Sequence, residues 1–287
     1  MPDVWENTRS RWESVRHAVD GGPAAGVVAA TLHGRPGLSV NPIAVTGEAG
    51  VGKSVLYDAL TQSIRTGDHD SSRSPDIEKH ATVLRFGSRR TRAAVTVIPG
   101  QLSTQREKAL QDTMRGDASP HGIVHVVAWG HNRIWQRASQ RDVHAALAAD
   151  GDVDQEAVRN WHRRKEVADF RLLVDEIIEG QAAQRLRWLI VAVSKCDLYW
   201  DRLDEARDYY IPGQAPRESP FALLMRDLEN ETSLRLSVLP MVSRLMRHQY
   251  LPGLPLGTSQ LDDAQIGALR THFGQELHSF ITQRNGH

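Results

Sequence analysis

The stretch that decides the fold is residues 47–54, Gly47-Glu48-Ala49-Gly50-Val51-Gly52-Lys53-Ser54, which matches the pattern GxxxxGK[ST] at every fixed position. An apolar run from Pro42 to Thr46 precedes it, and a helical pattern follows from about Lys53 to Arg65. Glycines let the backbone wrap closely around phosphates, so that successive N–H groups and the positive end of the helix face the anion. The order predicts a phosphate-binding loop for a nucleoside triphosphate, with a chance glycine turn as the alternative.

The last two residues of this loop carry the side chains that phosphate chemistry requires. Lys53 is expected to reach the β- and γ-phosphates, and so to act in catalysis as well as in binding. The Ser54 hydroxyl is expected to ligate Mg²⁺. The residues from Gly47 to Gly52 are expected to bind through their backbone. The loop alone does not choose between ATP and GTP.

A second motif, Ser194-Lys195-Cys196-Asp197, closes the apolar run Trp188 to Val193. Here the sequence resembles the P-loop GTPases of the Ras-like and translation-factor type, whose base-recognition motif is [NT]KxD at a strand end. The resemblance implies that Asp197 accepts hydrogen bonds from guanine N1–H and the exocyclic amine, which adenine does not offer there. It also implies that the stem of Lys195 covers the ring. Ser194 replaces Asn or Thr but can still bond nearby backbone, and Cys196 is expected to be inert.

A further likeness to these GTPases lies in Val238-Leu239-Pro240-Met241-Val242-Ser243. It resembles the strand and Ser that carry their last guanine contact, where a backbone N–H meets the base oxygen. Ser243 is therefore assigned to the base. The alternative for Ser243 is a serine that merely ends a strand. The alternative for residues 194–197 is an ordinary Lys-Asp pair at a turn.

The segment Val97-Ile98-Pro99-Gly100-Gln101 corresponds to the DxxGQ motif that these GTPases carry after a strand. The resemblance implies that Gly100 contacts the γ-phosphate and that Gln101 orients attacking water. Val97 departs from the pattern, because the family has Asp there to hold a water ligand of Mg²⁺. The chain is therefore identified as a divergent member with a degenerate second switch, for which we expect slow hydrolysis. The alternative is a buried strand ending in a Pro-Gly turn.

The first switch of the family has a looser counterpart in Ser74-Pro75-Asp76-Ile77-Glu78. Asp76 would stand where Ras-type proteins have Thr. Ser71, Ser72, Ser74 and Thr82 are alternative hydroxyl donors. A mobile polar loop is the competing interpretation for each of them.

The remaining segments predict an α/β fold. Helical patterns cover residues 3–19, 104–114, 220–230 and 262–283, and strand patterns cover 81–86, 93–98, 122–129, 188–193 and 234–242. Their alternation, with one hairpin, predicts a mostly parallel sheet with helices on both faces. We expect a P-loop NTPase fold of the GTPase-like kind at 41–287, preceded by an N-terminal helix and linker at 1–40.

A helical insertion is expected at about 131–187. Arg133, Arg137 and Arg141 are spaced to share a helical face, and a second basic cluster surrounds Trp161: Arg159, Arg163, Arg164 and Lys165. These arginines suit a partner-docking surface, a nucleic-acid contact or an arginine acting on the γ-phosphate. The alternative is a solvated face paired with its acidic neighbours, namely Asp142, Asp154, Glu156 and Glu166. The 35 basic and 35 acidic residues cancel, which argues against nucleic acid and leaves a protein partner favoured.

Composition narrows the class of protein further. No apolar run is long enough to span a bilayer, and the first residues lack the apolar centre of a signal peptide, so a cytoplasmic protein is expected. Cys196 is the single cysteine, which excludes an internal disulfide. The 13 histidines show no metal-binding spacing, although His121 and His125 are expected on one face of a strand.

Together these signals predict a guanine-nucleotide-binding switch protein that binds GTP or GDP with Mg²⁺, hydrolyses GTP slowly and signals to a protein partner. Two alternatives remain. One is a pseudo-GTPase interaction module with little turnover, which Val97 favours. The other is an ATP-using P-loop enzyme such as a kinase, against which Asp197 argues.

Overall fold

The computed structural model of the chain describes residues 4–21, 40–61, 78–86, 89–100, 104–115, 119–180, 185–213, 217–242 and 247–283. Its centre is a six-stranded sheet in the order β2-β3-β1-β4-β5-β6. The strands are β1 (Asn41–Thr46), β2 (Glu78–Phe86), β3 (Arg89–Val97), β4 (Gly122–Val127), β5 (Trp188–Val193) and β6 (Arg235–Pro240). All neighbours are parallel except β2 and β3, which form the antiparallel hairpin predicted from the sequence.

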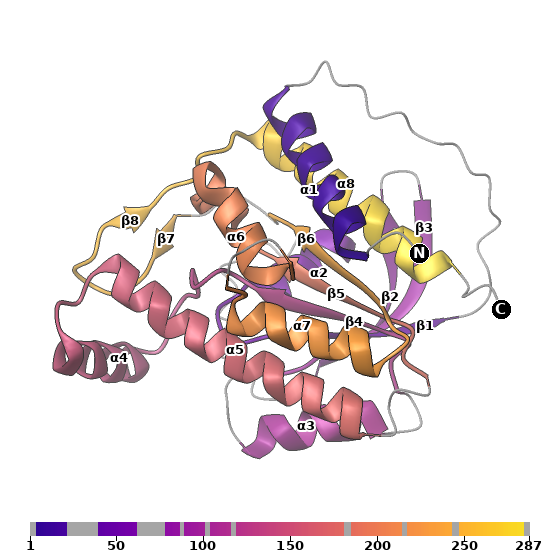
Figure 1. Cartoon of the computed structure of the whole chain (residues 1–287), viewed down its shortest axis with the longest axis horizontal. Helices are drawn as coiled ribbons and strands as arrows, with labels where there is room; N and C mark the ends of the chain where they lie inside the picture. Colours follow the sequence, from indigo (N-terminus) through magenta and orange to yellow (C-terminus); the bar gives the residue numbers. More distant parts are fainter. Residues whose placement is uncertain are drawn as a thin grey trace.

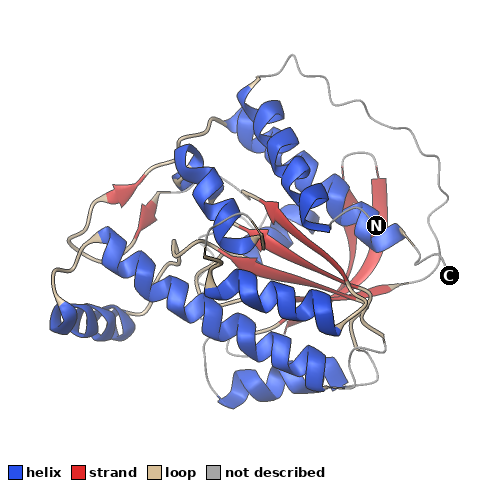
Figure 2. Ribbon diagram, in the orientation of Figure 1, coloured by secondary structure: helices blue, strands red, loops and turns tan. Residues whose placement is uncertain are grey.

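Helices cover both faces of this sheet (Figures 1 and 2). One face packs against α3 (Thr104–Arg115), α5 (Gln155–Glu179) and α7 (Pro220–Glu231), and the other against α2 (Lys53–Thr61) and α8 (Asp263–Thr282). Successive residues of β4 alternate between the two cores, since Ile123 and Val127 join the first and Val124 and Val126 the second. A strand buried on both faces reads as a continuous apolar run, and the predicted α/β architecture is confirmed.

Helix α1 (Val4–Asp20) closes the β6 side of the sheet, where it lies along α8 (Figure 1). Its buried face joins the same core as α5 and α7 through Trp5, Trp12, Val15 and Val19. The indole Nε1 of Trp12 donates to the carbonyl oxygen of Val238 in β6 at 2.7 Å. Residues 4–20 are therefore part of the sheet's own core.

The connection from β4 to β5 contains two helices with different roles. The crossover helix α5 packs against the sheet, whereas α4 (Arg137–Asp150) lies outside it and buries only Val143 and Leu147. These two side chains pack on Tyr250 and Leu251. The latter residues belong to a small hairpin, β7 (His248–Gln249) and β8 (Leu256–Gly257), which the sequence analysis did not predict.

Two local expectations about this connection were wrong. β4 ends at Val127, because Trp129 adopts the left-handed φ of 47°. Arg133 does not share the helical face of Arg137 and Arg141, because α4 begins only at Arg137. The backbone N–H of Arg133 instead donates to the carbonyl of Gly50 at 3.2 Å.

None of the described helices is both long enough and apolar enough to span a bilayer.

Candidate functional site

The loop from Gly47 to Ser54 joins the end of β1 to the start of α2, as predicted. Gly47, Gly50 and Gly52 have positive φ angles of 130°, 76° and 106°. A Cβ atom at Gly47 would lie 2.2 Å from the carbonyl oxygen of Val126, and one at Gly50 would lie 2.1 Å from that of Arg133. Glycine is thus required at both positions, because β4 and the chain that follows it run directly against the loop.

Lys53 folds back across this loop. Its Nζ donates to the carbonyl oxygens of Gly47 at 2.7 Å and Glu48 at 2.9 Å. Burial, and next the nearby guanidinium of Arg106, lower the pKa of Lys53 to about 7. Ser54 follows as the second residue of α2 and is half-buried. Two neighbouring desolvated cations favour an anion between them, so the donors at this loop fit a polyphosphate.

The end of β5 is bonded directly to the same loop. The Nζ of Lys195 donates to the carbonyl oxygens of Gly50 at 2.7 Å and His131 at 2.6 Å. The hydroxyl of Ser194 donates to the carbonyl oxygen of Val51 at 2.7 Å, which confirms that serine can bond nearby backbone there. Lys195 takes the left-handed φ of 57°, and burial lowers its pKa to about 7. The structure therefore brings residues 47–54 and 194–197 together, although about 140 residues separate them.

Asp197 lies in the short 3-10 helix η3 (Cys196–Leu198) and is only 3% exposed. Burial raises the pKa of its carboxyl group, and a hydrogen bond from the Ser259 side chain opposes that shift. Its neighbour Cys196 is fully buried, and burial raises the pKa of the thiol to about 12. A thiol with so high a pKa is a weak nucleophile at neutral pH, as expected. Ser243 lies outside the described residues.

Within the described part of the chain, the end of β3 reaches the loop through its backbone. Val97 is buried and pairs with Val45 of β1. The carbonyl oxygen of Gly100 accepts a hydrogen bond from the N–H of Ala49 at 2.8 Å. A Cβ atom at Gly100 would lie 2.5 Å from the backbone nitrogen of Ala49 and 2.6 Å from the backbone carbon of Glu48, so only glycine fits there.

Several residues assigned to the switches cannot be placed. Gln101 lies outside the described residues, and so do Ser71, Ser72, Ser74, Pro75, Asp76 and Ile77. Of the alternatives, Thr82 lies within β2. Glu78 begins β2, opposite Val97 in the β2–β3 register.

Sequence analysis missed the inward role of the Glu48 side chain. Its Oε2 accepts a hydrogen bond from Asn132 Nδ2 at 2.6 Å and lies 3.8 Å from Nδ1 of His162. Burial raises the pKa of Glu48 to about 8, although the cations Lys165 and Lys53 act in the opposite direction. The side chain therefore fastens the phosphate loop to the segment after β4. The motif allows any residue at position 48, so the pattern gave no signal.

A buried polar network under the loop was also missed. Arg106 of α3 forms an ion pair with Asp169 of α5, and both are buried. His125 of β4 places Nε2 4.0 Å from Asp169, while its Nδ1 lies 2.8 Å from the hydroxyl of Thr46. The network thus joins the helix after Gly100 to the strand end before Gly47. His121, expected on the face of His125, precedes β4 instead.

Glu166 of α5 does not pair with an arginine, contrary to one expectation. Its Oε1 accepts hydrogen bonds from the N–H groups of Ala128 at 2.9 Å and Gly130 at 3.3 Å, and its Oε2 accepts from the Tyr210 hydroxyl at 2.7 Å. Glu166 therefore fixes the backbone turn after β4. Among the acidic residues of the basic cluster, Glu156 does pair, with Arg159 and Arg163.

Within the residues that the structure describes, no three His, Cys, Asp or Glu side chains are grouped to hold a metal ion. In the loop, the hydroxyl of Ser54 is a group that could ligate a magnesium ion. The half-buried position of Ser54 directly after Lys53 fits such a ligand.

Comparison with known proteins gives little beyond this geometry. No protein-family model matches the chain, and no curated protein matches it. Among solved structures, a bacterial selenocysteine-specific elongation factor, EF-Sec, is similar over 72% of this chain and 26% of its own, with 14% identity and a TM-score of 0.39. Methanosarcina barkeri Roco2 RocCORdC bound to GDP is similar over 88% of this chain and 52% of its own, with 12% identity and a TM-score of 0.41.

The chain thus spans about a quarter of the length of EF-Sec and about half that of the Roco2 structure. At TM-scores of 0.39 and 0.41 these likenesses carry no argument about function. The fold assignment rests on the sheet order and on the glycine-rich loop between β1 and α2.

Proposed function

We propose that this chain is a guanine-nucleotide-binding switch protein that binds GTP or GDP with Mg²⁺, hydrolyses GTP slowly and signals to a protein partner. The observation that carries the proposal is the double hydrogen bond of Lys195, whose ammonium joins the loop at Gly50 to the segment after β4. Lys195 lies two residues before Asp197, so this contact supports a single ligand whose phosphates bind the loop and whose base binds the end of β5.

In this proposal the loop residues hold the phosphates. Lys53 exchanges its bonds to the carbonyls of Gly47 and Glu48 for bonds to phosphate oxygens, and its charge is restored by their negative charge. The backbone N–H groups of residues 47–54 supply further donors. Mg²⁺, when bound at the Ser54 hydroxyl, would neutralise charge on the phosphates.

Asp197 and Lys195 recognise the base. The Asp197 carboxylate accepts from guanine N1–H and the exocyclic amine, and a bond from each of two donors suits a carboxylate. Lys195 covers the ring with its aliphatic stem. Ser243 adds a backbone N–H toward the base oxygen. An adenine presents no donor pair to Asp197, so ATP is disfavoured.

Slow turnover follows from the composition of the β3 end. Val97 has no oxygen with which to hold a water ligand of Mg²⁺, so a metal would be fixed less firmly. Gln101 would orient the attacking water. A buried valine at this position equally suits a second candidate function, a nucleotide-stabilised interaction module with little or no turnover.

Switching would begin at Gly100. A γ-phosphate needs the N–H of Ala49 and the Nζ of Lys53, and Gly100 lies against both. Gly100 and the start of α3 would therefore shift when the terminal phosphate enters or leaves. Because Arg106 of α3 pairs with Asp169, such a shift acts on α5 as well.

Calorimetric titration of the purified chain with GTP, GDP and ATP, each with and without Mg²⁺, tests this proposal. We expect GTP and GDP to bind at least tenfold more tightly than ATP, and Mg²⁺ to strengthen GTP binding. Tighter binding of ATP would favour an ATP-using enzyme. If the chain bound none of the three nucleotides, both the switch and the interaction module would be excluded.

A further inference from the structure

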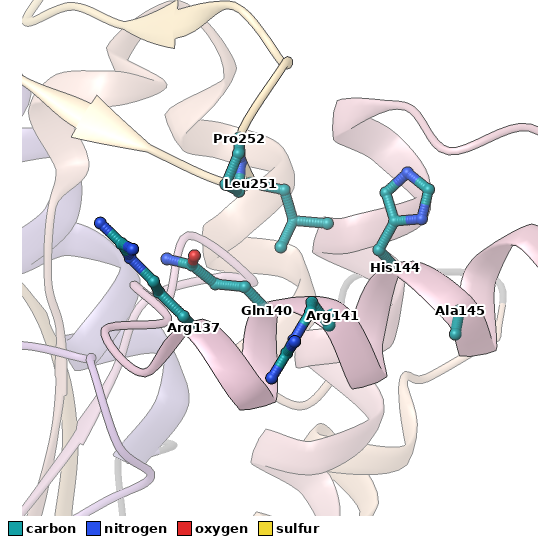
Figure 3. Close-up of a pocket in the computed structure, with 7 residues that line it drawn as sticks. All are labelled: Arg137, Gln140, Arg141, His144, Ala145, Leu251 and Pro252. Carbon is teal, nitrogen blue, oxygen red and sulfur yellow. The ribbon is translucent and has the colours of Figure 1, made fainter.

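A pocket of about 760 Å³ lies between α4 and the turn of the β7–β8 hairpin, away from the phosphate loop. Figure 3 shows the α4 side chains on one side and the two hairpin residues on the other. The lining consists of Arg137, Gln140, Arg141, His144, Ala145, Leu251 and Pro252. Spacings of three, four, seven and eight residues put the five helical residues on one face of α4.

The walls of this pocket are held in place by buried contacts. Val143 and Leu147, on the inner side of α4, pack against Tyr250 and Leu251. The side-chain amide of Gln140 donates to the carbonyl oxygen of Ile134 at 2.8 Å, which fixes the first turn of α4. The pocket is therefore preformed, which lowers the entropic cost of binding.

The charge of the lining has one sign. Arg137 and Arg141 are exposed, stand one turn apart, and form no ion pair with any residue that the structure describes. Other arginines nearby are paired, since Arg163 bonds Glu156 and Arg202 bonds Glu205. Among the described residues that line the pocket, none is acidic. The unpaired guanidinium groups therefore favour an anionic ligand, and their planar geometry matches a carboxylate.

We propose that this pocket docks an acidic segment of a protein partner, with carboxylates on Arg137 and Arg141 and an apolar side chain against Leu251 and Pro252. The inference goes beyond the proposed function, because docking of such a segment needs no nucleotide. The apolar side chains of Leu251 and Pro252, on the hairpin side, distinguish this surface from a purely cationic patch. They give a peptide an apolar anchor in addition to its charges.

A protein segment fits better than nucleic acid. Among the described residues that line it, none is a Phe, Tyr or Trp, whose large rings form the usual stacking platforms for bases. The chain as a whole has a net charge of zero, so no long-range field draws a polyanion to it. Only two arginines and one histidine face the pocket.

Peptide selection on the full chain tests the proposal. Peptides from a random phage-displayed library are selected on the wild-type protein, synthesised with a fluorescent label and titrated by fluorescence polarisation. The first variant is Arg137→Glu with Arg141→Glu. The second, Ala145→Trp, fills the pocket without changing its charge. The matched control reverses two exposed arginines of α5, Arg164→Glu with Arg171→Glu.

We expect the selected peptides to be enriched in Asp and Glu and to contain an apolar residue. Their affinity should fall at least tenfold in each pocket variant and less than twofold in the control. Peptides without acidic enrichment, or peptides whose affinity is unchanged in both pocket variants, would overturn the proposal.

A labelled single-stranded DNA 12-mer is titrated alongside. Tighter binding of this DNA than of any peptide, with loss in the pocket variants, would make the surface a nucleic-acid site instead. GDP binding is measured in both pocket variants and should be unchanged. Loss of peptide binding can then be told apart from loss of nucleotide binding.

Discussion

The ends of β3 and β5 both reach the phosphate loop, yet they do so with different chemistry. β5 presents a hydroxyl and an ammonium group that each donate to a loop carbonyl, and a carboxylate follows. β3 presents a buried valine, and in the described residues at its end the contact with the loop is made by the backbone of Gly100. Under the proposed function the end of β5 holds the ligand, and the end of β3 acts on its terminal phosphate. On that proposal, binding and turnover depend on separate strands, so a chain could keep one while the other weakens.

The largest expected effect breaks the binding side. Lys53→Ala should lower GTP affinity more than 100-fold, because it removes the cation that meets the β- and γ-phosphates. Calorimetric titration measures the loss, and Lys108→Ala on the exposed side of α3 is the matched control. GTP binding as tight as in the wild type would mean that the loop does not hold phosphate.

Asp197→Ala should act on the β5 end in a way that depends on the base. The loss of hydrogen bonds to a carboxylate should weaken GTP binding by about 2–4 kcal/mol while ATP binding stays nearly unchanged. Competition titrations with both nucleotides give the two values, and Asp227→Ala, an exposed aspartate of α7, serves as the control. Equal losses for GTP and ATP would contradict guanine recognition by Asp197.

Glu48→Gln tests whether the loop, to which both strand ends bond, contains a buried neutral carboxyl group. With its pKa raised to about 8, Glu48 is protonated in the folded chain at pH 7 but ionised when unfolded. Folding then costs about 3 kcal/mol for proton uptake, which glutamine avoids. Urea unfolding at pH 7 should show the variant more stable by about that amount.

The pH dependence of this gain provides an internal control. A raised folded pKa contributes stability that is full below pH 4.5 and is lost as the pH rises through 8. The advantage of glutamine should therefore grow from nearly nothing at pH 4 to its full size above pH 8. A variant less stable than the wild type at pH 8 would show that Glu48 is ionised and paired with the nearby lysines.

The smallest expected effect repairs the β3 end. Val97→Asp should lower the Mg²⁺ concentration needed for half-maximal single-turnover hydrolysis by about threefold, since it restores an oxygen toward the metal's water ligand. Val97→Asn is the matched control without the charge. Gln101→Leu should lower the already slow rate further. Fast wild-type turnover that is insensitive to Gln101 would move catalysis away from this strand end.

Local signals made most of the fold predictable from sequence. The spacing of Gly47, Gly52 and Lys53 fixes the phosphate loop, and the strand Trp188–Val193 was predicted with the bounds that the structure has. The hairpin β7–β8 escaped because strands of two residues have no periodicity. Arg133 was misplaced because helical spacing was extended over a segment whose backbone bonds Gly50.

The buried polar contacts of the site were not predictable in the same way. Glu48 and Asn132 lie 84 residues apart, and no fixed spacing connects them. Arg106 and Asp169 belong to separate helices, where single charged residues usually face solvent. Such pairs depend on how helices dock, which the local pattern of a single sequence does not reveal.

The bond between Trp12 and Val238 has a consequence for the order in which the chain is made. Its two residues are 226 positions apart, so α1 leaves the ribosome long before β6 does. Until residues 235–240 emerge, the tryptophans of α1 lack the strand on which they pack. Contacts between such distant segments form late and expose apolar surface in the interval. The apolar face of α1 would then need protection until β6 has been synthesised.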